Sequence, residues 1–311
     1  MRIVSLLPSA TEILFAVGAG DSVVGVTFEC DFPPEAHSRR VVANTTLPEG
    51  LSPSQIDAEI RARVHAGEDI YRLDAGALAD LAPEIVITQD LCAVCAVEVA
   101  KVEEALDHLG CRARVVTLDP MTLDGVWDSI IEVGEVTGRT DEAVELVESL
   151  RRRLAAVAAA VEGRPRPRVA VLEWTDPPYS SGHWVPDMVT AAGATPVLGA
   201  AGERSHRIEW ADVTAAAPDL VVVAPCGYRL ADAAGMAADV VTAAVLPPGA
   251  QVWGVDANAV FVRPGPRLVD GIEALAAIAH PGAVPARDDL AVRVPDSSPP
   301  RRRRGAGPGR D

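Results

Sequence analysis

A helical segment near the middle of the chain constrains the fold more than any other sequence feature. Over residues 141–162, apolar side chains recur at the three- and four-residue spacing of one helix face; they are Ala143, Leu146, Val147, Leu150, Leu154, Val157, Ala158 and Val161. Thr140 is a candidate N-cap, and Gly163 with Pro165 and Pro167 ends the helix. By itself the segment also fits an ordinary amphipathic helix packed on a single sheet. Because strand-rich sequence flanks it on both sides, we expect a rigid rod that joins two lobes.

The sequence on the two sides of this helix repeats one order of strand-like runs. The matched runs are 2–6 with 168–172, 82–87 with 217–223, and 115–119 with 252–256. Short β-branched runs that alternate with helical segments predict βαβ units, so each half should form a small parallel sheet with helices between its strands. One continuous doubly wound domain is the alternative, but 311 residues exceed the usual size of a single domain.

These patterns predict one architecture of the α/β class: two βα lobes with parallel sheets, joined by a long rigid helix, with a ligand cleft between the lobes. The expected boundaries are 1–120 for the N-terminal lobe, 121–164 for the connecting region with its helix, 165–285 for the C-terminal lobe, and 286–311 for a disordered tail rich in Pro, Arg and Gly. Within the first lobe, Ser9 and Glu12 have the spacing of a helix capping box. Residues 48–66 insert a helix without a counterpart in the second half, either a lid or an embellishment.

Composition and charge exclude several classes of function. The net charge is −16 and no basic face is visible, so we expect no binding of nucleic acid. No apolar run approaches the roughly 20 residues of a membrane helix, so we expect no stable membrane insertion. The sequence enters its first strand without the basic and apolar regions of an export signal, which predicts a cytoplasmic location. Five cysteines, an odd number, are then expected to be reduced thiols.

The sharpest local signal is a C-x-x-C motif, Cys92 to Cys95, which follows the strand-like run 85–88 and begins a helix. The positive end of a helix dipole lowers the pKa of cysteine thiols, which suits such a pair to metal ligation or redox exchange. Cysteine is also a small residue that is often buried, so simple packing of both side chains is the alternative.

Further polar and aromatic residues gather in loops that follow predicted strands. In open parallel sheets, ligands bind at the carboxyl ends of the strands, and in two facing lobes those ends would meet in one cleft. The stretch 173–184 alone has three aromatic side chains, a histidine and two acidic residues, in a chain with 4% aromatic residues. The candidate ligand contacts are Glu29, Asp90, Glu173, Trp174, Tyr179, His183, Trp184, Asp256, Asn258 and Arg263.

Four cysteines that follow strand ends form the candidate metal site: Cys30, Cys92, Cys95 and Cys226. Thiolates bind zinc at about 2.3 Å, so one closed site requires the four sulfur atoms to converge in the cleft. His183 would serve there as an auxiliary ligand or hydrogen-bond donor, and Glu173 as a supporting or ligand-contacting acid. Because Cys226 comes from the second half, metal binding would also lock the cleft closed. In the alternative, Cys30 and Cys226 pack behind the cleft as small apolar residues.

Five segments, taken in order, carry a family resemblance: RIVSLLPSATEILFAVGAGDSVVGVTFECDFP, LAPEIVITQDLC, DPPYSSGHWVPDMVTAAGA, IEWADVTAAAPDLVVVAP and VDANAVFVRPGPRLVDGIEALA. Together they resemble the cobalamin and iron-siderophore substrate-binding proteins of ABC importers, with the helical-backbone periplasmic-binding-protein fold, over roughly residues 1–280. The resemblance implies two βα lobes joined by a rigid helix, limited hinge motion and a ligand in the interlobe cleft. It is closest to the vitamin B12 branch, where aromatic side chains from both lobes line the cleft; Trp174, Tyr179 and Trp184 match that role by position.

The chain departs from that family pattern in several places. Exported members carry a signal or lipoprotein segment, whereas this sequence starts at its first strand. Members that dock on a permease resemble one another in an exposed glutamate on each lobe; Asp74 stands at the first-lobe position, and no clear counterpart stands near Thr190. The cysteines are not part of the usual cobalamin-binding pattern. Docking on an ABC permease is therefore doubtful, while binding of a small-molecule ligand is expected.

Two classes of function fit these observations. The favoured class, which is not enzymatic, is a cytoplasmic binding protein for cobalamin, another corrinoid or another metal-containing ligand. The alternative is a cytoplasmic enzyme on the same fold that uses a thiolate-held zinc or iron–sulfur (Fe-S) centre, or the pair Cys92 and Cys95, for redox chemistry. Nothing in the sequence resembles a nucleophile–base–acid triad, a phosphate-binding loop or a Rossmann glycine fingerprint.

Overall fold

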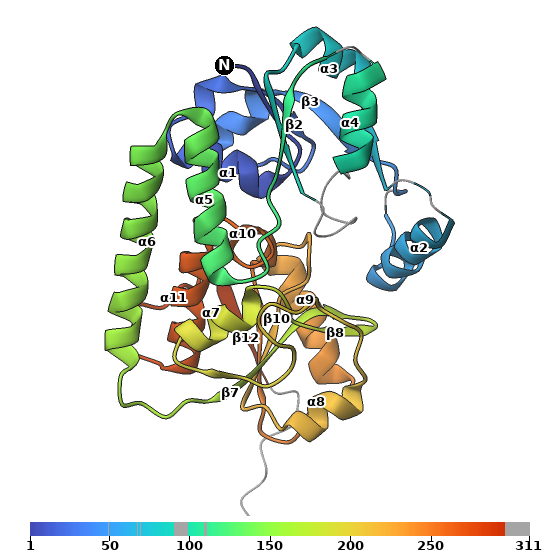
Figure 1. Cartoon of the computed structure of the whole chain (residues 1–311). Coiled ribbons are helices and arrows are strands. Elements are labelled where there is room, and N and C mark those ends of the chain that lie inside the picture. The colour runs from blue at the N-terminus through green and yellow to red at the C-terminus, as the bar shows by residue number, and fades with distance from the viewer. Residues whose placement is uncertain (49, 67, 69, 90–98, 109–110, 296–311) are drawn as a thin grey trace, which may run out of the picture.

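Two α/β lobes lie one above the other, and two long helices run along one side of the molecule (Figure 1). The computed structural model describes residues 1–48, 50–66, 68, 70–89, 99–108 and 111–295. Each lobe is built on its own sheet, so the prediction of two lobes rather than one continuous sheet is confirmed. None of the helices in the described ranges has the length and the apolar character needed to cross a lipid bilayer.

The sheet of the first lobe has the strand order β4-β3-β2-β1-β5-β6. Its strands are β1 (Ile3–Ser5), β2 (Val23–Thr27), β3 (Arg40–Thr45), β4 (Tyr71–Leu73), β5 (Ile85–Thr88) and β6 (Arg114–Thr117). All neighbours are parallel except β3 and β4. The helical segments of this lobe are α1 (Pro8–Ala16), η1 (Gly20–Ser22), η2 (Pro34–Ser38), α2 (Pro53–Ala66), α3 (Ala75–Leu81) and α4 (Val99–His108). Strands β1 and β5 are buried along their whole length, as expected for central parallel strands covered on both faces.

The sheet of the second lobe has the strand order β12-β11-β10-β7-β8, and β9 also pairs with β7. Its strands are β7 (Arg168–Thr175), β8 (Pro178–Ser180), β9 (Thr195–Pro196), β10 (Leu220–Val223), β11 (Gln251–Val255) and β12 (Ala291–Val294). Its helices are α7 (Val185–Ala191), α8 (Trp210–Ala216), α9 (Leu230–Thr242), α10 (Ala257–Val260) and α11 (Leu268–Ala279). Strands β7, β10 and β11 are parallel, whereas β8 and β12 run antiparallel to their neighbours at the two edges.

The repeat in the sequence is present in both sheets. In the first lobe, β2, β1, β5 and β6 are successive parallel neighbours. In the second lobe, β9, β7, β10 and β11 are related in the same way. The predicted α/β class with two mainly parallel sheets is therefore confirmed, with antiparallel strands added at the sheet edges.

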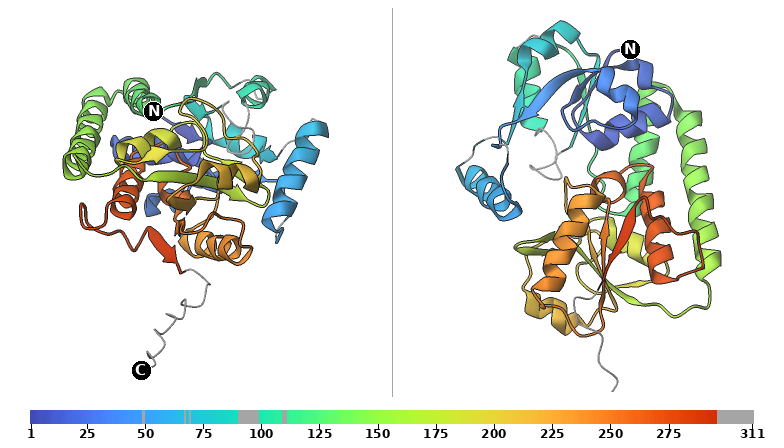
Figure 2. Two further views of the ribbon diagram at one scale, coloured as in Figure 1. Left: turned by 90° about the horizontal axis from the view of Figure 1, so that it is seen from below. Right: turned by 180° about the vertical axis from the view of Figure 1, so that it is seen from behind.

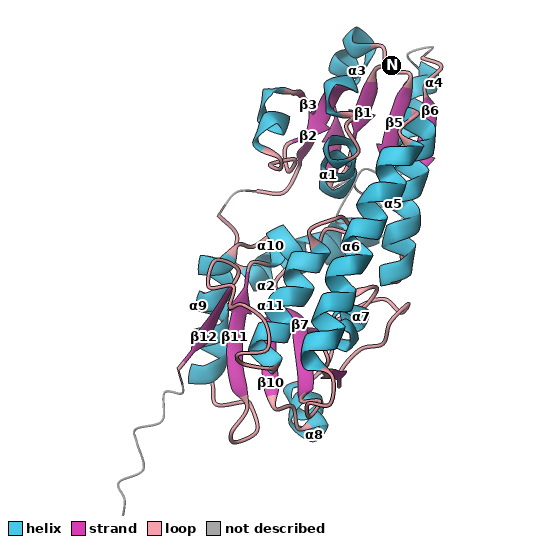
Figure 3. Cartoon of the chain, turned by 90° about the vertical axis from the view of Figure 1, so that its left-hand side faces the viewer, coloured by secondary structure: helices cyan, strands magenta, loops and turns pink. Residues whose placement is uncertain are grey.

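Helices α5 (Leu123–Thr137) and α6 (Thr140–Val161) form the side that joins the lobes, and Figure 3 shows them side by side. Helix α6 buries most of the predicted apolar face, and its buried residues are Ala143, Val147, Leu150, Val157 and Val161. Its N-cap is Arg139, without a side-chain cap, rather than the predicted Thr140. Arg153 of α6 binds Asp270 at 2.6 Å and Glu273 at 2.9 Å, both on α11. The rod is thus tied to the second lobe by apolar packing and by charge.

Apolar packing and buried charges also connect the two lobes. One core cluster contains Ile13 of α1, Trp127 of α5 and Phe261 of the second lobe. Near it, Arg263 of the second lobe binds Glu12 of α1 at 3.3 Å. The Arg263 side chain is only 7% exposed and that of Glu12 only 2%. These contacts hold the lobes in one relative position.

Two local predictions are wrong. The capping box of Ser9 and Glu12 does not form, because α1 begins at Pro8 and its N-cap is Leu7, which leaves Ser9 inside the first turn. Disorder over 286–311 is wrong for β12, which pairs antiparallel with β11. The open edge of a sheet offers unpaired backbone groups to any extended segment, and this gain outweighs the unfavourable composition around the strand.

Candidate functional site

The loops at the carboxyl ends of the strands meet between the lobes, where a cavity of about 620 Å³ lies. This volume is within the usual range of small-molecule and cofactor sites. The first lobe contributes the loop after β2, strand β4 and helix α2. The second lobe contributes the end of β7, strand β8, the turn before α7 and the loop after β10. The predicted position of the ligand site, between the lobes, therefore coincides with a real cavity.

Aromatic side chains from both lobes form much of the cavity wall. In the second lobe, the rings of Trp174 and Tyr228 have centroids 5.7 Å apart. In the first lobe, Phe28 and Tyr71 have ring centroids 6.3 Å apart. Trp184, only 6% exposed, adds a further indole to the wall. Flat apolar surfaces contributed by two lobes suit a large planar ligand.

The turn that carries His183 is held in one conformation. The backbone nitrogen of Gly182 donates a hydrogen bond to Oε1 of Glu173 at 3.0 Å. A Cβ atom at Gly182 would lie 2.3 Å from the backbone nitrogen of Ser205, so only glycine fits there. His183 itself has a left-handed φ of 53°. Such a conformation is costly for a residue with a side chain, and residues that keep it tend to cluster at functional sites.

The imidazole of His183 is suited to a polar contact with a ligand. Its Nε2 atom is buried and has no hydrogen-bond partner among the described residues. Burial, and then the charge of Arg204, lower the pKa of His183 below its ordinary value of 6.5. The imidazole is therefore neutral at neutral pH, and it can donate one hydrogen bond, accept another or bind a metal ion.

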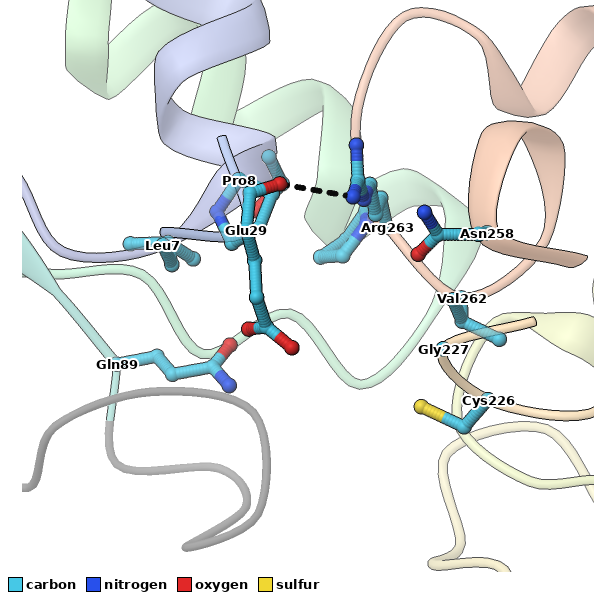
Figure 4. Close-up of a pocket in the computed structure, with 11 residues that line it drawn as sticks. Leu7, Pro8, Glu29, Gln89, Cys226, Gly227, Asn258, Val262 and Arg263 are labelled. Atoms are coloured by element: carbon cyan, nitrogen blue, oxygen red, sulfur yellow. Dashed lines mark hydrogen bonds between the residues drawn. The ribbon is translucent and has the colours of Figure 1, made fainter. Parts of the chain in front are cut away.

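Glu29 places a carboxyl group at the cavity wall, where its Oε2 accepts a hydrogen bond from the hydroxyl of Tyr71 at 3.2 Å. Burial raises the pKa of Glu29 above its usual 4.5, although Tyr71 and Arg263 oppose this shift. Figure 4 shows the Glu29 side chain beside Gln89 and across from Cys226 of the second lobe. These residues line a second, smaller cavity of about 60 Å³, which has room for a few water molecules. The site therefore combines a large aromatic cavity with a small polar one.

The structure brings most of the candidate ligand contacts together. Those that line the large cavity are Glu29, Glu173, Trp174, Tyr179, His183 and Trp184, and those that line the small one include Glu29, Asn258 and Arg263. The guanidinium of Arg263 is committed to Glu12 and to Asp31, which ties the lobes together. Asp256 caps α10, because its Oδ1 accepts a hydrogen bond from the nitrogen of Ala259 at 2.9 Å. Asp90 lies outside the described residues.

Only two of the four candidate metal ligands lie in the described part of the chain. Cys30 is buried, and its sulfur makes hydrogen bonds with Thr11 at 3.1 Å and Thr27 at 3.4 Å. Burial raises the pKa of this thiol, so it is neutral and packed in the core. Cys226 is exposed and lines both cavities.

The predicted site with four cysteines stays a prediction, because Cys92 and Cys95 lie outside the described residues. Within the described ranges, no three His, Cys, Asp or Glu side chains are grouped so that they could hold a metal ion.

Sequence reasoning missed several cavity residues, among them Phe28, Ile56, Ile60, Tyr71, Gln89, Tyr228 and Phe261. Phe28 is adjacent to the predicted contact Glu29, and Tyr228 stands two residues after Cys226, so their positions after strand ends could have identified them. The residues of α2 carried no such signal, because nothing in the sequence of this helix indicates which face it turns to the cleft.

Comparisons with known proteins agree with this arrangement. A family model described as periplasmic binding protein matches residues 3–245. A cobalamin-binding protein of Halobacterium salinarum is 25% identical over 294 residues, which cover 90% of this chain and 69% of that protein. The fold is shared with a periplasmic heme-binding protein from Pseudomonas aeruginosa, at a TM-score of 0.65 and 22% identity over 96% of this chain and 98% of that one. It is also shared with the periplasmic vitamin B12-binding protein of Vibrio cholerae, at a TM-score of 0.60 and 20% identity over 89% and 95% of the two chains.

Proposed function

Because the chain belongs to the periplasmic binding protein family, we propose that it binds a corrinoid of the vitamin B12 class in the cavity between its lobes. The name of the Halobacterium relative, a cobalamin-binding protein, supports this ligand class. Of the two proteins of like fold, one is named for vitamin B12 and the other for heme, and both ligands are flat macrocycles around a metal ion.

The aromatic wall built by both lobes is the observation that carries the proposal. A corrin ring has wide apolar faces, and aromatic side chains bury such faces at a small cost in conformational entropy. Trp174 and Tyr228 would contact the macrocycle from the second lobe, and Phe28 and Tyr71 from the first.

Polar groups in the wall match the amide substituents of a corrinoid. The pKa of the Glu29 carboxyl group is raised by burial, which favours its protonated form, and this form and the amide of Gln89 can each donate a hydrogen bond to an amide oxygen. The neutral imidazole of His183 would contact either the central metal or a peripheral amide. A few polar groups placed in an apolar wall fix the orientation of a bound ligand.

Three expectations from the sequence remain predictions and are not part of this proposal. They are the cytoplasmic location, a thiolate site that includes Cys92 and Cys95, and the alternative of an enzyme that uses these thiols. That docking on an ABC permease is doubtful also stays a prediction. Asp74, the candidate docking residue, is exposed and caps α3 by accepting a hydrogen bond from the nitrogen of Ala77 at 2.9 Å.

Titration of the full chain with cyanocobalamin tests the proposal. We expect saturable binding with one ligand per chain in calorimetry, accompanied by quenching of tryptophan fluorescence, because Trp174 and Trp184 line the cavity. Hemin, titrated in parallel, separates a corrinoid site from a site for another macrocycle. A folded chain that shows no saturable binding of cyanocobalamin would contradict the proposal, and binding of hemin alone would assign the cavity to a different ligand.

A further inference from the structure

Helix α2 lies on the side of the molecule opposite to α5 and α6. Figures 1 and 2 show it extending from the first lobe, at the level where the two lobes meet. The helix belongs to the insertion 48–66, for which the sequence leaves two interpretations open, a lid and an embellishment. The contacts of α2 distinguish them.

One face of α2 forms part of the cavity wall. Ile56, Asp57, Ile60 and Arg61 all line the large cavity, and residues three or four positions apart lie on one face of a helix. Ile56 and Ile60 provide apolar surface. Asp57 and Arg61 form an ion pair, with 2.5 Å between Oδ2 and Nη2. The inserted helix is therefore a wall of the ligand site.

A hydrogen bond connects this wall to the opposite lobe. The hydroxyl of Tyr179, on β8, donates to Oδ1 of Asp57 at 3.2 Å. The Asp57 side chain is only 11% exposed, whereas that of Arg61 is 55% exposed. Burial and the nearby charge of Asp57 raise the pKa of Tyr179, so its hydroxyl keeps the proton that it donates. This bond spans the cavity from one lobe to the other.

The attachment of α2 to its own lobe is light. Among the α2 residues whose burial is described, none is fully buried. Arg63 donates to Oγ1 of Thr46 at 2.5 Å, and Ile60 packs against the first-lobe core. Shortly before the helix, Gly50 has a left-handed φ of 76°, and the position that a Cβ atom would take there is open. A segment with few buried contacts can open at a low cost in free energy.

We infer that α2 is a lid over the ligand cavity and that the hydrogen bond from Tyr179 to Asp57 is the latch that holds it to the second lobe. The identity of the ligand rests on the proposed function, whereas the latch is a property of the ligand-free chain. If the ligand passes under α2, the latch must open for entry and for exit. Its removal should then raise the association and dissociation rates together and change the affinity little.

Stopped-flow kinetics of cyanocobalamin binding to the full chain test whether the association and dissociation rates rise together. Tyr179→Phe removes only the hydroxyl, and we expect both rate constants to rise about fivefold, the effect of one lost hydrogen bond. Glu59→Gln is the matched control on the same helix, because Glu59 pairs with Arg63 at 2.8 Å away from the cavity lining. The control should keep the wild-type rates. A rise in the dissociation rate alone would show that Tyr179 is a simple ligand contact and would overturn the lid.

Hydrogen exchange of the ligand-free chain provides a second measurement. Tyr179→Phe should speed the exchange of the backbone amides of α2 severalfold and leave those of α6 unchanged. Tyr228→Phe, which alters the tyrosine packed against Trp174, should leave the exchange of α2 at the wild-type rate. Equal exchange of α2 in the wild type and in Tyr179→Phe would overturn the latch. If the wild type fails to bind cyanocobalamin, the proposed function fails, and the exchange result still decides whether the latch exists.

Discussion

Arg267 of the second lobe holds Glu12 of the first through two hydrogen bonds, from Nε to Oε2 at 2.8 Å and from Nη2 to Oε1 at 2.6 Å. Arg263 adds a third contact, from Nη1 to Oε1 at 3.3 Å. Because the Glu12 side chain is 2% exposed, its charge depends on these two guanidinium groups for compensation. The partners belong to different lobes, so the same contacts that satisfy the charge also fix the shape of the cavity between the lobes.

Replacement of Glu12 by Gln should lower the free energy of unfolding by about 3 kcal/mol, because removal of one partner of a buried ion pair leaves the other charge uncompensated. Urea denaturation followed by circular dichroism measures this change. Glu142→Gln is the control, since Glu142 pairs with Arg139 at 2.8 Å on the exposed surface and such pairs contribute little. Equal stability of the two variants would contradict a structural role for Glu12.

Local sequence patterns predicted the elements of the fold but not the contacts between its lobes. The helix expected over 141–162 is Thr140–Val161, because its periodic apolar face and its closing Gly163 are both local signals. Glu12 was assigned to a capping box on equally local spacing. Its actual partners, Arg263 and Arg267, stand 251 and 255 residues away, and only the folded chain brings them to Glu12.

The candidate site was predictable where its residues follow strands. Glu29 lies just after β2, and Trp174 lies at the end of β7, so both could be placed at the carboxyl edge of a sheet. The wall formed by α2 could not be predicted, because its orientation depends on the contact of Asp57 with Tyr179, which is 122 residues away. Strand β12 was missed because four residues at a sheet edge gain their order from pairing with β11 rather than from their own composition.

Replacement of Trp174 by Leu should weaken the binding of cyanocobalamin about tenfold, because one aromatic face of the proposed macrocycle site is lost. Calorimetric titration measures the affinity. Trp210→Leu is the control: Trp210 lies on α8 and packs against a separate core cluster that includes Val213 and Val221. This control should keep the wild-type affinity. A similar loss in both variants would point to general destabilisation instead of a contact with the ligand.

The lowered pKa of His183 makes stability depend on pH in a defined direction. The unfolded chain protonates this imidazole more readily than the folded chain, so its contribution to stability is present above about pH 6.5 and is lost as the pH falls toward the folded pKa. Asn tolerates a left-handed φ, so His183→Asn should reduce the fall in melting temperature between about pH 7.5 and pH 5.5. Differential scanning calorimetry measures this fall in melting temperature. The control is His37→Asn, at an exposed position of η2, in which the melting temperature should fall as much as in the wild type. If the melting temperature of His183→Asn also falls as much as that of the wild type, the prediction is wrong.

Glu29 should make the stability of the fold depend on pH in the opposite direction from His183. Burial raises the pKa of its carboxyl group, so the folded chain binds the proton more readily than the unfolded chain. The stability that this group contributes is therefore full below about pH 4.5 and is lost as the pH rises through the folded pKa. Glu29→Gln keeps an oxygen that can accept the hydrogen bond from Tyr71 and cannot ionise. The variant should melt at a higher temperature than the wild type at neutral pH and at nearly the same temperature near about pH 4.

Scanning calorimetry at both pH values distinguishes this effect from a simple change in packing, which would shift the melting temperature equally at both. Glu35→Gln is the matched control, because Glu35 lies exposed on η2 of the same lobe and should show no such difference. If Glu29→Gln is less stable than the wild type at neutral pH, the ionised carboxylate is the form that the fold favours. In that case Glu29 would accept hydrogen bonds from the ligand rather than donate one, and the cavity would select a ligand that presents N–H or O–H groups at this position.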